Sequence, residues 1–311
     1  MPPPEDSQGH RPPGGLSRRS LLLAAAGTGV AGAVTAGLID RSPDRVLHAL
    51  SRSASSAYPS VLTGPGITRV ERIYSRARGR EVDVALVLPS REPPEGMPVS
   101  VLLHGRSGSA RNAAAPGLAY RLGKQVERGA VPSYGFIAVD GGNSYWHEHA
   151  EGDDPLGMLL DEVPRWLRER GLGGAKGLPF AATGTSMGGF GAFLYARRRG
   201  EQGDPVDAIA AISPALLTSW SKMRKRKAFD DKADWASMDP LLHLDTTRHV
   251  PTAVWCGEQD PFIEGVREFI RKSRPEIGYT ARGGHSGRFF RTATPGLISF
   301  LGKHTPERRT D

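Results

Sequence analysis

One serine of this 311-residue chain lies in a short pattern that is typical of a catalytic nucleophile. Gly184-Thr185-Ser186-Met187-Gly188 has the form GxSxG, with an apolar run before it and a helical run after it. In such an elbow between strand and helix, the serine hydroxyl stands at a strained turn, and the glycines let strand and helix approach closely. A glycine-rich turn with an ordinary surface serine has the same pattern. Partners elsewhere in the chain must therefore decide between the two interpretations.

The partners that a serine nucleophile requires occur later in the chain. A serine needs a base to remove its proton, and the base needs an acid to orient it and stabilise its charge. Asp260 follows the short apolar run 252–256, and His285 lies in a glycine-rich loop. The order Ser186, Asp260, His285 is the chain order of α/β-hydrolases. Glu258 lies in the same loop as Asp260 and is the alternative acid.

The charge that develops on a substrate oxygen also needs hydrogen-bond donors, which are usually two backbone amides. Met187 directly follows the nucleophile and is predicted to supply one amide. The turn His104-Gly105-Arg106 follows another apolar run, and Arg106 is predicted to supply the second. Because His285 already fills the position of the base, His104 is interpreted as a residue that shapes this loop.

Further polar and aromatic residues follow the apolar run 135–139. Asn143 and Trp146 are predicted to line the substrate pocket, although an aromatic plug beneath a loop is an equally good interpretation of Trp146. The run His147-Glu148-His149 contains metal-capable side chains without helical spacing or a distant fourth ligand. We therefore predict no metal site and no cofactor.

The apolar runs predict the sheet that must position these residues. Strands are expected over 67–76 and 80–88, as an edge hairpin, and then in five buried runs at 99–103, 135–139, 180–183, 208–213 and 252–256, with a short strand at 277–280. Helical patterns alternate with the buried runs, which favours right-handed crossovers and a mostly parallel sheet with helices on both faces. The prediction is an α/β-hydrolase fold over 66–311, with a small insertion from 214 to about 249, after the sixth strand.

The N-terminal segment has the pattern of an export signal. Arg18 and Arg19 precede an apolar stretch rich in Gly and Ala, which is typical of a twin-arginine signal over 1–39, followed by a linker over 40–65. A weakly hydrophobic membrane anchor is the alternative for residues 21–39. The prediction is an exported protein that is secreted or associated with the cell envelope.

Composition limits the partners of the chain. The formal net charge is +8, but the basic clusters lack the interleaved aromatic residues of a nucleic-acid site, so no nucleic-acid partner is predicted. The run 222–227 is interpreted as a solvated charged surface, with contact to an anionic envelope lipid as the sharper hypothesis. Cys256 is the only cysteine and lies in an apolar run, which favours a buried structural thiol.

Together these motifs resemble the putative-esterase family, which includes esterase D and the antigen 85-type mycolyltransferases. The similarity is carried by the His104-Gly105 turn, the loop 140–146, the elbow at Ser186, Ile212-Ser213-Pro214, and the loops of Asp260 and His285. It implies a serine hydrolase with Ser186 as nucleophile, His285 as base and an acidic third member. In the mycolyltransferases that acid is a glutamate, and here Asp260 occupies the favoured position.

Three functions are compatible with this pattern. The first is an exported serine hydrolase that cleaves small-molecule or lipid carboxylic esters through an acyl-enzyme on Ser186. The alternative is an antigen 85-like acyltransferase that moves the acyl group to a sugar or lipid hydroxyl. The third is a non-catalytic envelope-binding protein on a hydrolase scaffold, against which the complete set of Ser, Asp and His counts.

Overall fold

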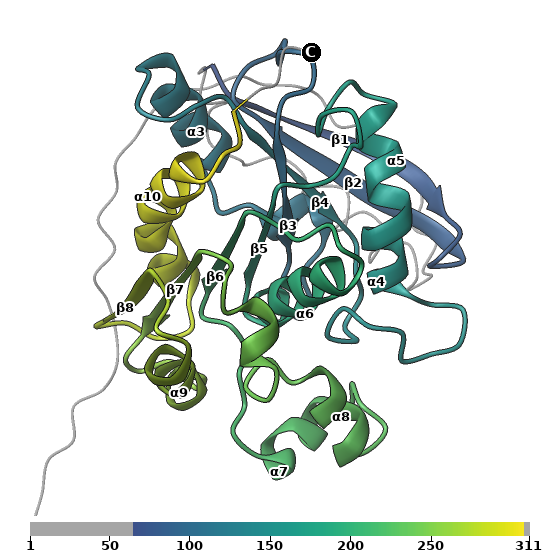
Figure 1. The fold of residues 1–311 in the computed structure, drawn as a ribbon, viewed down its shortest axis with the longest axis vertical. Coiled ribbons are helices and arrows are strands. Elements are labelled where there is room, and N and C mark those ends of the chain that lie inside the picture. The colour runs from purple at the N-terminus through teal and green to yellow at the C-terminus, as the bar shows by residue number, and fades with distance from the viewer. Residues whose placement is uncertain (1–64, 308–311) are drawn as a thin grey trace, which may run out of the picture. The chain divides into compact units, whose positions relative to one another are not determined.

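The described part of the protein is built on one central sheet. The computed structural model describes residues 65–307, and within them lies an eight-stranded sheet of order β1-β2-β4-β3-β5-β6-β7-β8 (Figure 1). The strands are β1 Ile67–Ser75, β2 Arg80–Leu88, β3 Val99–Leu103, β4 Gly135–Val139, β5 Ala181–Thr185, β6 Ala208–Ile212, β7 Thr252–Gly257 and β8 Ile277–Ala281. The predicted export segment 1–39 lies outside the described residues, as does the predicted linker 40–65 apart from Pro65.

The strand pairing confirms the predicted α/β-hydrolase fold and corrects one detail. β1 and β2 form an antiparallel hairpin, β2 pairs antiparallel with β4, and the strands from β4 to β8 are parallel. Val101 of β3, for example, lies between Ile137 of β4 and Ala182 of β5. The two hairpin strands were both expected at the edge, but only β1 lies there, with β8 at the opposite edge. β2 is instead largely buried, because β4 covers its second side.

Helices cover both faces of the sheet because side chains of the inner strands alternate between two apolar clusters. Val84 and Leu86 of β2 belong to one cluster, whereas Ala85 and Val87 belong to the other. The first cluster packs against α4 Pro155–Gly157, the π-helical turn η1 Met158–Glu162, α5 Val163–Arg168, α6 Met187–Glu201 and α9 Ile263–Ser273. The second packs against α2 Ala110–Ala113, α3 Leu118–Glu127 and α10 Gly287–Lys303 (Figure 1).

Two helical segments have irregular features. Asp154 caps α4 and Pro155 begins it, and the π-helical turn η1 then interrupts the segment. Pro164 has no amide hydrogen to give to the preceding turn, and a wider π turn before it accommodates this loss. The helix α6 after the elbow runs to Glu201, and the left-handed glycine beyond it is Gly203.

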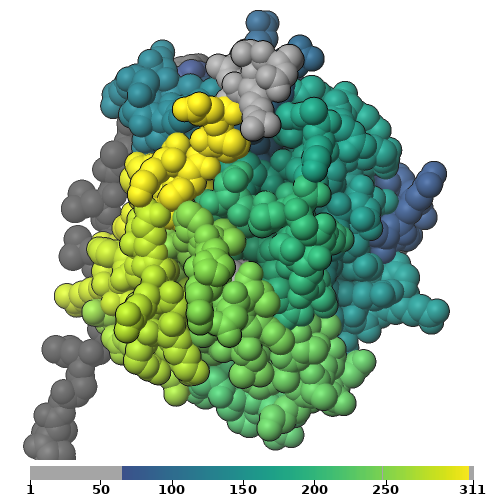
Figure 2. All heavy atoms as spheres, in the orientation of Figure 1, coloured from purple at the N-terminus to yellow at the C-terminus, as the bar shows by residue number. Residues whose placement is uncertain are grey.

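The predicted insertion between β6 and β7 is a separate group of short helices. It contains α7 Trp220–Met223, η2 Arg224–Arg226, α8 Lys232–Met238 and η3 Leu244–Thr247. In the space-filling view it lies at the lower end of the face that also carries α10 (Figure 2). Among residues 65–307, none of the helices combines the length and apolar composition needed to cross a membrane.

Candidate active site

The nucleophile elbow has the close packing that its glycines predict. A Cβ on Gly184 would lie 2.0 Å from the carbonyl oxygen of Gly188, and one on Gly188 would lie 1.9 Å from that of Leu103. Ser186 itself has a φ of 59°, a conformation that costs energy in a non-glycine residue. Its amide donates to the carbonyl of Ile212 at 3.0 Å, and its carbonyl accepts from the amide of Ala215 at 2.9 Å. The turn is therefore held from the neighbouring β6 end.

The three predicted catalytic side chains form one hydrogen-bonded series. His285 Nε2 lies 3.0 Å from Ser186 Oγ, and His285 Nδ1 lies 2.8 Å from Asp260 Oδ2. Asp260 is 2% exposed, whereas Glu258 is exposed and uses its amide to pair with Ala281. The structure thus places Asp260, and not Glu258, against the histidine. An ionised Asp260 fixes the proton of His285 on Nδ1 and leaves Nε2 free to accept the serine proton.

The electrostatics around Asp260 favour its charged form. Burial opposes ionisation, but hydrogen bonds from His285 and from the Phe262 amide at 2.9 Å outweigh it, so the pKa of Asp260 is lowered below its ordinary value. Ser213 adds to this effect from beside the carboxylate, although its buried hydroxyl makes no hydrogen bond of ordinary geometry among the described residues. Ser213 also has a positive φ of 47°. The sequence signal that could have revealed the role of Ser213 beside Asp260 is its position directly after β6, at the same edge of the sheet.

The loop of the acid and the loop of the base are joined directly through their backbones. The amide of Gln259 donates to the carbonyl of Gly283 at 2.8 Å, and the Gln259 side chain accepts from the Gly283 amide at 2.7 Å. A Cβ on Gly257 would lie 2.3 Å from that same carbonyl oxygen of Gly283. The rings of Phe262 and Phe290 flank His285, with centroids 5.1 and 5.2 Å from its own, and the residue remains exposed to solvent. Ser213 lies in the motif Ile212-Ser213-Pro214, whereas no role is predicted for Gln259 from the sequence.

The turn after β3 lies against the nucleophile, as expected for an oxyanion loop. A Cβ on Gly105 would be 3.2 Å from Ser186 Cβ, and the next residue, Arg106, lines the same cavity as Ser186. Met187 is the first residue of α6, where helical amides have no carbonyl partner within the helix. The structure therefore brings both predicted donor residues, Met187 and Arg106, to Ser186.

His104 shapes this loop and is not part of the triad. Its ring is buried, with Nε2 accepting from the Gly141 amide at 2.9 Å, so that the proton lies on Nδ1 and is donated to the Gly105 carbonyl at 2.8 Å. Burial lowers the pKa of His104, which keeps the ring in this neutral form. The loops after β3 and β4 are therefore fastened together beside the nucleophile.

Asn143 and Trp146 also hold these loops, and neither lines the cavity beside Ser186. The Asn143 side chain accepts from the amide of Ser107 at 2.6 Å, at a residue with a φ of 62°. Trp146 is fully buried, and its ring occupies the space that a Cβ on Gly141 or Gly191 would need. Of the two interpretations of Trp146, the plug beneath a loop describes its position. The sequence signal for the buried position of Trp146 is that Gly141 and Gly191, which lie against its indole ring, have no side chains.

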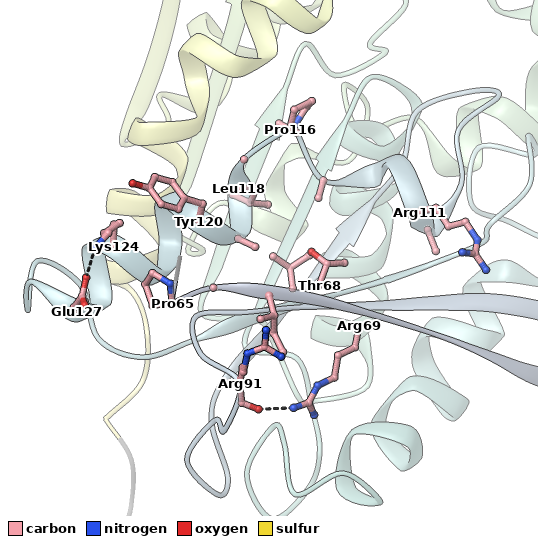
Figure 3. Close-up of a pocket in the computed structure, with 18 residues that line it drawn as sticks. Pro65, Thr68, Arg69, Arg91, Arg111, Pro116, Leu118, Tyr120, Lys124 and Glu127 are labelled. Carbon is pink, nitrogen blue, oxygen red and sulfur yellow. Dashed lines mark hydrogen bonds and ion pairs between the residues drawn. The ribbon is translucent and has the colours of Figure 1, made fainter. Parts of the chain in front are cut away.

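Two hollows lie near each other on this part of the molecule, and Ser186 and His285 line only one of them. A cavity of about 330 Å³ is lined by Ser186, His285 and Arg106. A larger hollow of about 1020 Å³ lies between the start of β1 and α3, away from Ser186 (Figure 3). Most of its charged side chains are engaged: Arg69 donates to the Arg91 carbonyl, Arg111 pairs with Asp83, and Lys124 pairs with Glu127 at 2.7 Å. Because Ser186 and His285 line the smaller cavity and not this hollow, the smaller cavity is the candidate active site.

Comparisons with known proteins identify a family that the chain matches. The model of the putative-esterase family matches residues 75–270. S-formylglutathione hydrolase of Saccharomyces cerevisiae is 34% identical over 91 residues, a segment that covers 27% of this chain and 30% of that enzyme. The match therefore spans less than a third of the length of this relative.

Solved structures show the same fold at low sequence identity. A ferulic acid esterase is 17% identical with a TM-score of 0.62, covering 76% of this chain and 98% of its own. An S-formylglutathione hydrolase from Agrobacterium tumefaciens is 18% identical with a TM-score of 0.60, covering 79% and 98%. At these identities the similarity establishes the α/β-hydrolase fold of the described residues.

Proposed function

Because the chain belongs to the putative-esterase family, we propose that it is a serine esterase that cleaves carboxylic esters through an acyl-enzyme on Ser186. The observation that carries this proposal is the hydrogen-bonded series from Ser186 through His285 to Asp260. In the first half of the reaction, Ser186 Oγ attacks the ester carbonyl while His285 Nε2 takes its proton. The amides of Met187 and Arg106 stabilise the resulting oxyanion.

The second half of the reaction follows from the same groups. The tetrahedral intermediate collapses, the C–O bond to the alcohol breaks, and His285 returns its proton to the leaving oxygen. Water then attacks the acyl carbonyl while His285 takes its proton. The bond from the acyl carbon to Ser186 Oγ breaks, the carboxylic acid leaves, and His285 returns the proton to Ser186 Oγ. Asp260 keeps the imidazole oriented and stabilises its positive charge in both halves.

Labelling with a fluorophosphonate tests this function. The wild type is expected to react with the probe and to hydrolyse p-nitrophenyl acetate, and Ser186→Ala is expected to lose labelling and at least about 10³-fold in kcat. The matched control is Ser299→Ala, at an exposed position of α10, which is expected to keep both. An unlabelled and inactive wild type would instead favour a binding protein on a hydrolase scaffold.

A product analysis separates hydrolysis from acyl transfer. The purified protein is incubated with a p-nitrophenyl ester, with and without glycerol or trehalose. Hydrolysis predicts that free acid accumulates at the same rate in both mixtures. Build-up of acylated glycerol or trehalose in place of the acid would show that the acyltransferase alternative is correct.

Export through a twin-arginine route remains part of the proposal, on the basis of the residues alone. Arg18 and Arg19 precede the apolar stretch, and the chain requires no disulfide because Cys256 is its only cysteine. Replacing both arginines by lysine is expected to leave the protein inside the cell, as measured by fractionation of cells and medium. Unchanged export of the double variant would contradict the proposal.

A further inference from the structure

The cavity beside Ser186 has an apolar interior that the catalytic steps themselves do not use. Among the described residues, only two ionisable side chains line it, Arg106 and His285, and His285 contacts Ser186. Its inner wall contains Leu102 and Ile212, the first from β3 and the second from β6, both 5% exposed or less. A group that enters the cavity from Ser186 therefore passes from a polar entrance to apolar walls.

One wall of the cavity is a single face of α10. Phe290, Thr294 and Leu297 follow the spacing i, i+4, i+7, which places them on one side of a helix. Thr294 and Leu297 are buried, and the Thr294 hydroxyl donates to the Phe290 carbonyl at 3.1 Å. The hydroxyl is thus engaged by the helix backbone, which leaves the wall apolar.

A second wall comes from the end of α2 and the segment that joins it to α3. Ala113, Ala114, Ala115 and Pro116 line the cavity with small side chains that carry no polar group, and Leu118 continues this wall. A charged or strongly polar group between these two walls would lose its hydration without gaining a partner, at a cost of several kcal/mol for an ion. An apolar group would gain about fourfold in binding for each methylene that it buries.

We propose that this cavity holds the acyl part of the substrate, and that the preferred acyl group is apolar with up to about ten non-hydrogen atoms. A volume of about 330 Å³ corresponds to this size at about 30 Å³ for each water-sized group. The acyl group stays bonded to Ser186 through both halves of the reaction, whereas the alcohol must leave and water must enter. An apolar cavity therefore suits the acyl group, which stays bonded to Ser186, better than the alcohol, which must leave. A formyl or acetyl group would leave most of it unfilled.

This inference rests on the proposed esterase function, and a series of substrates tests the two separately. For p-nitrophenyl esters from acetyl upwards, kcat/KM is expected to rise about fourfold per added methylene, up to about octanoyl, and then to level off or fall. A 3-phenylpropenoyl ester of similar size distinguishes a rigid aromatic acyl group from a straight chain, and preference for either over acetyl supports the proposal. A protein that reacts with a fluorophosphonate but shows no dependence on acyl size would overturn this inference and leave the esterase function standing.

A second series distinguishes the acyl group from the alcohol as the occupant. Acetate esters of methanol, butanol and hexanol are compared by titration of the acid released. Because the alcohol lies outside the cavity in this proposal, no systematic rise with its length is expected. A rise with alcohol length and none with acyl length would assign the cavity to the alcohol and contradict the proposal.

Variants of the two walls should shift the preference in opposite directions. Ala114→Phe fills the cavity and is expected to lower the ratio of octanoyl to acetyl kcat/KM at least about tenfold. Leu297→Ala enlarges it and is expected to move the preferred acyl chain to a greater length. Ser299→Phe, on the exposed side of α10, is the control that should leave the ratio unchanged. Thermal unfolding and fluorophosphonate labelling report whether each variant is folded, and an unchanged ratio in folded, labelled wall variants would refute the assignment.

Discussion

Two aspartates with the same burial have opposite electrostatics in this protein. Asp260, in the loop after β7, is 2% exposed, and Asp239, at the end of α8 in the insertion, is 3% exposed. Burial raises the pKa of both carboxyls. At Asp260 several hydrogen bonds reverse this effect and lower the pKa, whereas Asp239 has mainly the Leu241 amide at 3.1 Å, and its pKa is raised to about 6.

The comparison teaches that burial by itself does not make a carboxylate catalytic. What distinguishes the acid of the triad is the set of donors that keeps it charged in a dry site, and above all the histidine that it orients. Among the described residues, no histidine acts on Asp239. Burial of its charged form therefore lowers the stability of the folded protein.

Removing the charge of Asp260 should have the largest effect. Asp260→Asn is expected to lower kcat by about 10³ to 10⁴-fold, because an amide stabilises the wrong tautomer of His285. Steady-state hydrolysis of p-nitrophenyl acetate measures this, with thermal unfolding to confirm the fold. Glu258→Gln, in the same loop but exposed, is the control and should change kcat little. A large loss in Glu258→Gln alone would make Glu258 the acid after all.

Disturbing the contact between the loops of Asp260 and His285 should destabilise the protein. Gly257→Ala brings a Cβ to 2.3 Å from the Gly283 carbonyl, so a backbone shift is required, and we expect a loss of about 3 kcal/mol in the free energy of unfolding. Urea denaturation measures it. Gly200→Ala is the control, because a Cβ there meets nothing within 4 Å and a helical alanine is favoured by about 0.5–1 kcal/mol. Equal stabilities of the two variants would show that the loops are not tightly coupled.

Asp239 should make the protein less stable as pH rises. Because its pKa is raised from 3.8 to about 6 in the folded state, the folded protein binds the extra proton between these values, and stability falls as pH increases through this window. Asp239→Asn removes the effect and is expected to gain up to about 3 kcal/mol over the wild type between pH 4 and pH 7. Urea unfolding at several pH values measures the difference.

The contribution of Asp260 to stability should change with pH in the opposite direction. Its lowered pKa contributes stability that is present above the ordinary value of 3.8 and is lost as pH falls through the lower folded value. Asp260→Asn should therefore lose stability relative to the wild type at neutral pH, and the deficit should shrink only in strong acid. A difference between Asp239→Asn and wild type that does not change with pH would contradict the contrast between the two carboxyls.

Ser213 should give the smallest effect. Ser213→Ala removes a group that lowers the pKa of Asp260, so we expect a loss of about 1 kcal/mol or less in transition-state stabilisation, or at most about fivefold in kcat/KM. The acidic limb of the pH profile should also move to higher pH. A uniform loss of activity at every pH would indicate that Ser213 acts only through packing at its strained turn.

The sequence was most informative where chemistry depends on local pattern. The elbow at Ser186 was predictable because close packing of strand and helix there admits only glycine at positions 184 and 188. The inner strands were predictable because both of their faces are covered, which produces continuous apolar runs. The position of the hairpin was less predictable: both strands were expected at the edge, and the pairing of β2 with β4 removes β2 from it.

The residues alone were enough to predict Ser186 as the nucleophile, the chain order Ser186, Asp260, His285 and the type of fold, because these predictions depend on residue types at short spacing. The three-dimensional structure was needed to distinguish Asp260 from Glu258, which are two residues apart: the buried Asp260 side chain contacts His285, whereas Glu258 is exposed. It also placed Trp146 beneath the loops and built the cavity wall from α10 and the segment before α3. The contact of Asp260 with His285 joins residues 25 positions apart, and the cavity walls come from segments that are separated by more than a hundred residues. No local pattern records the space that is left between such segments.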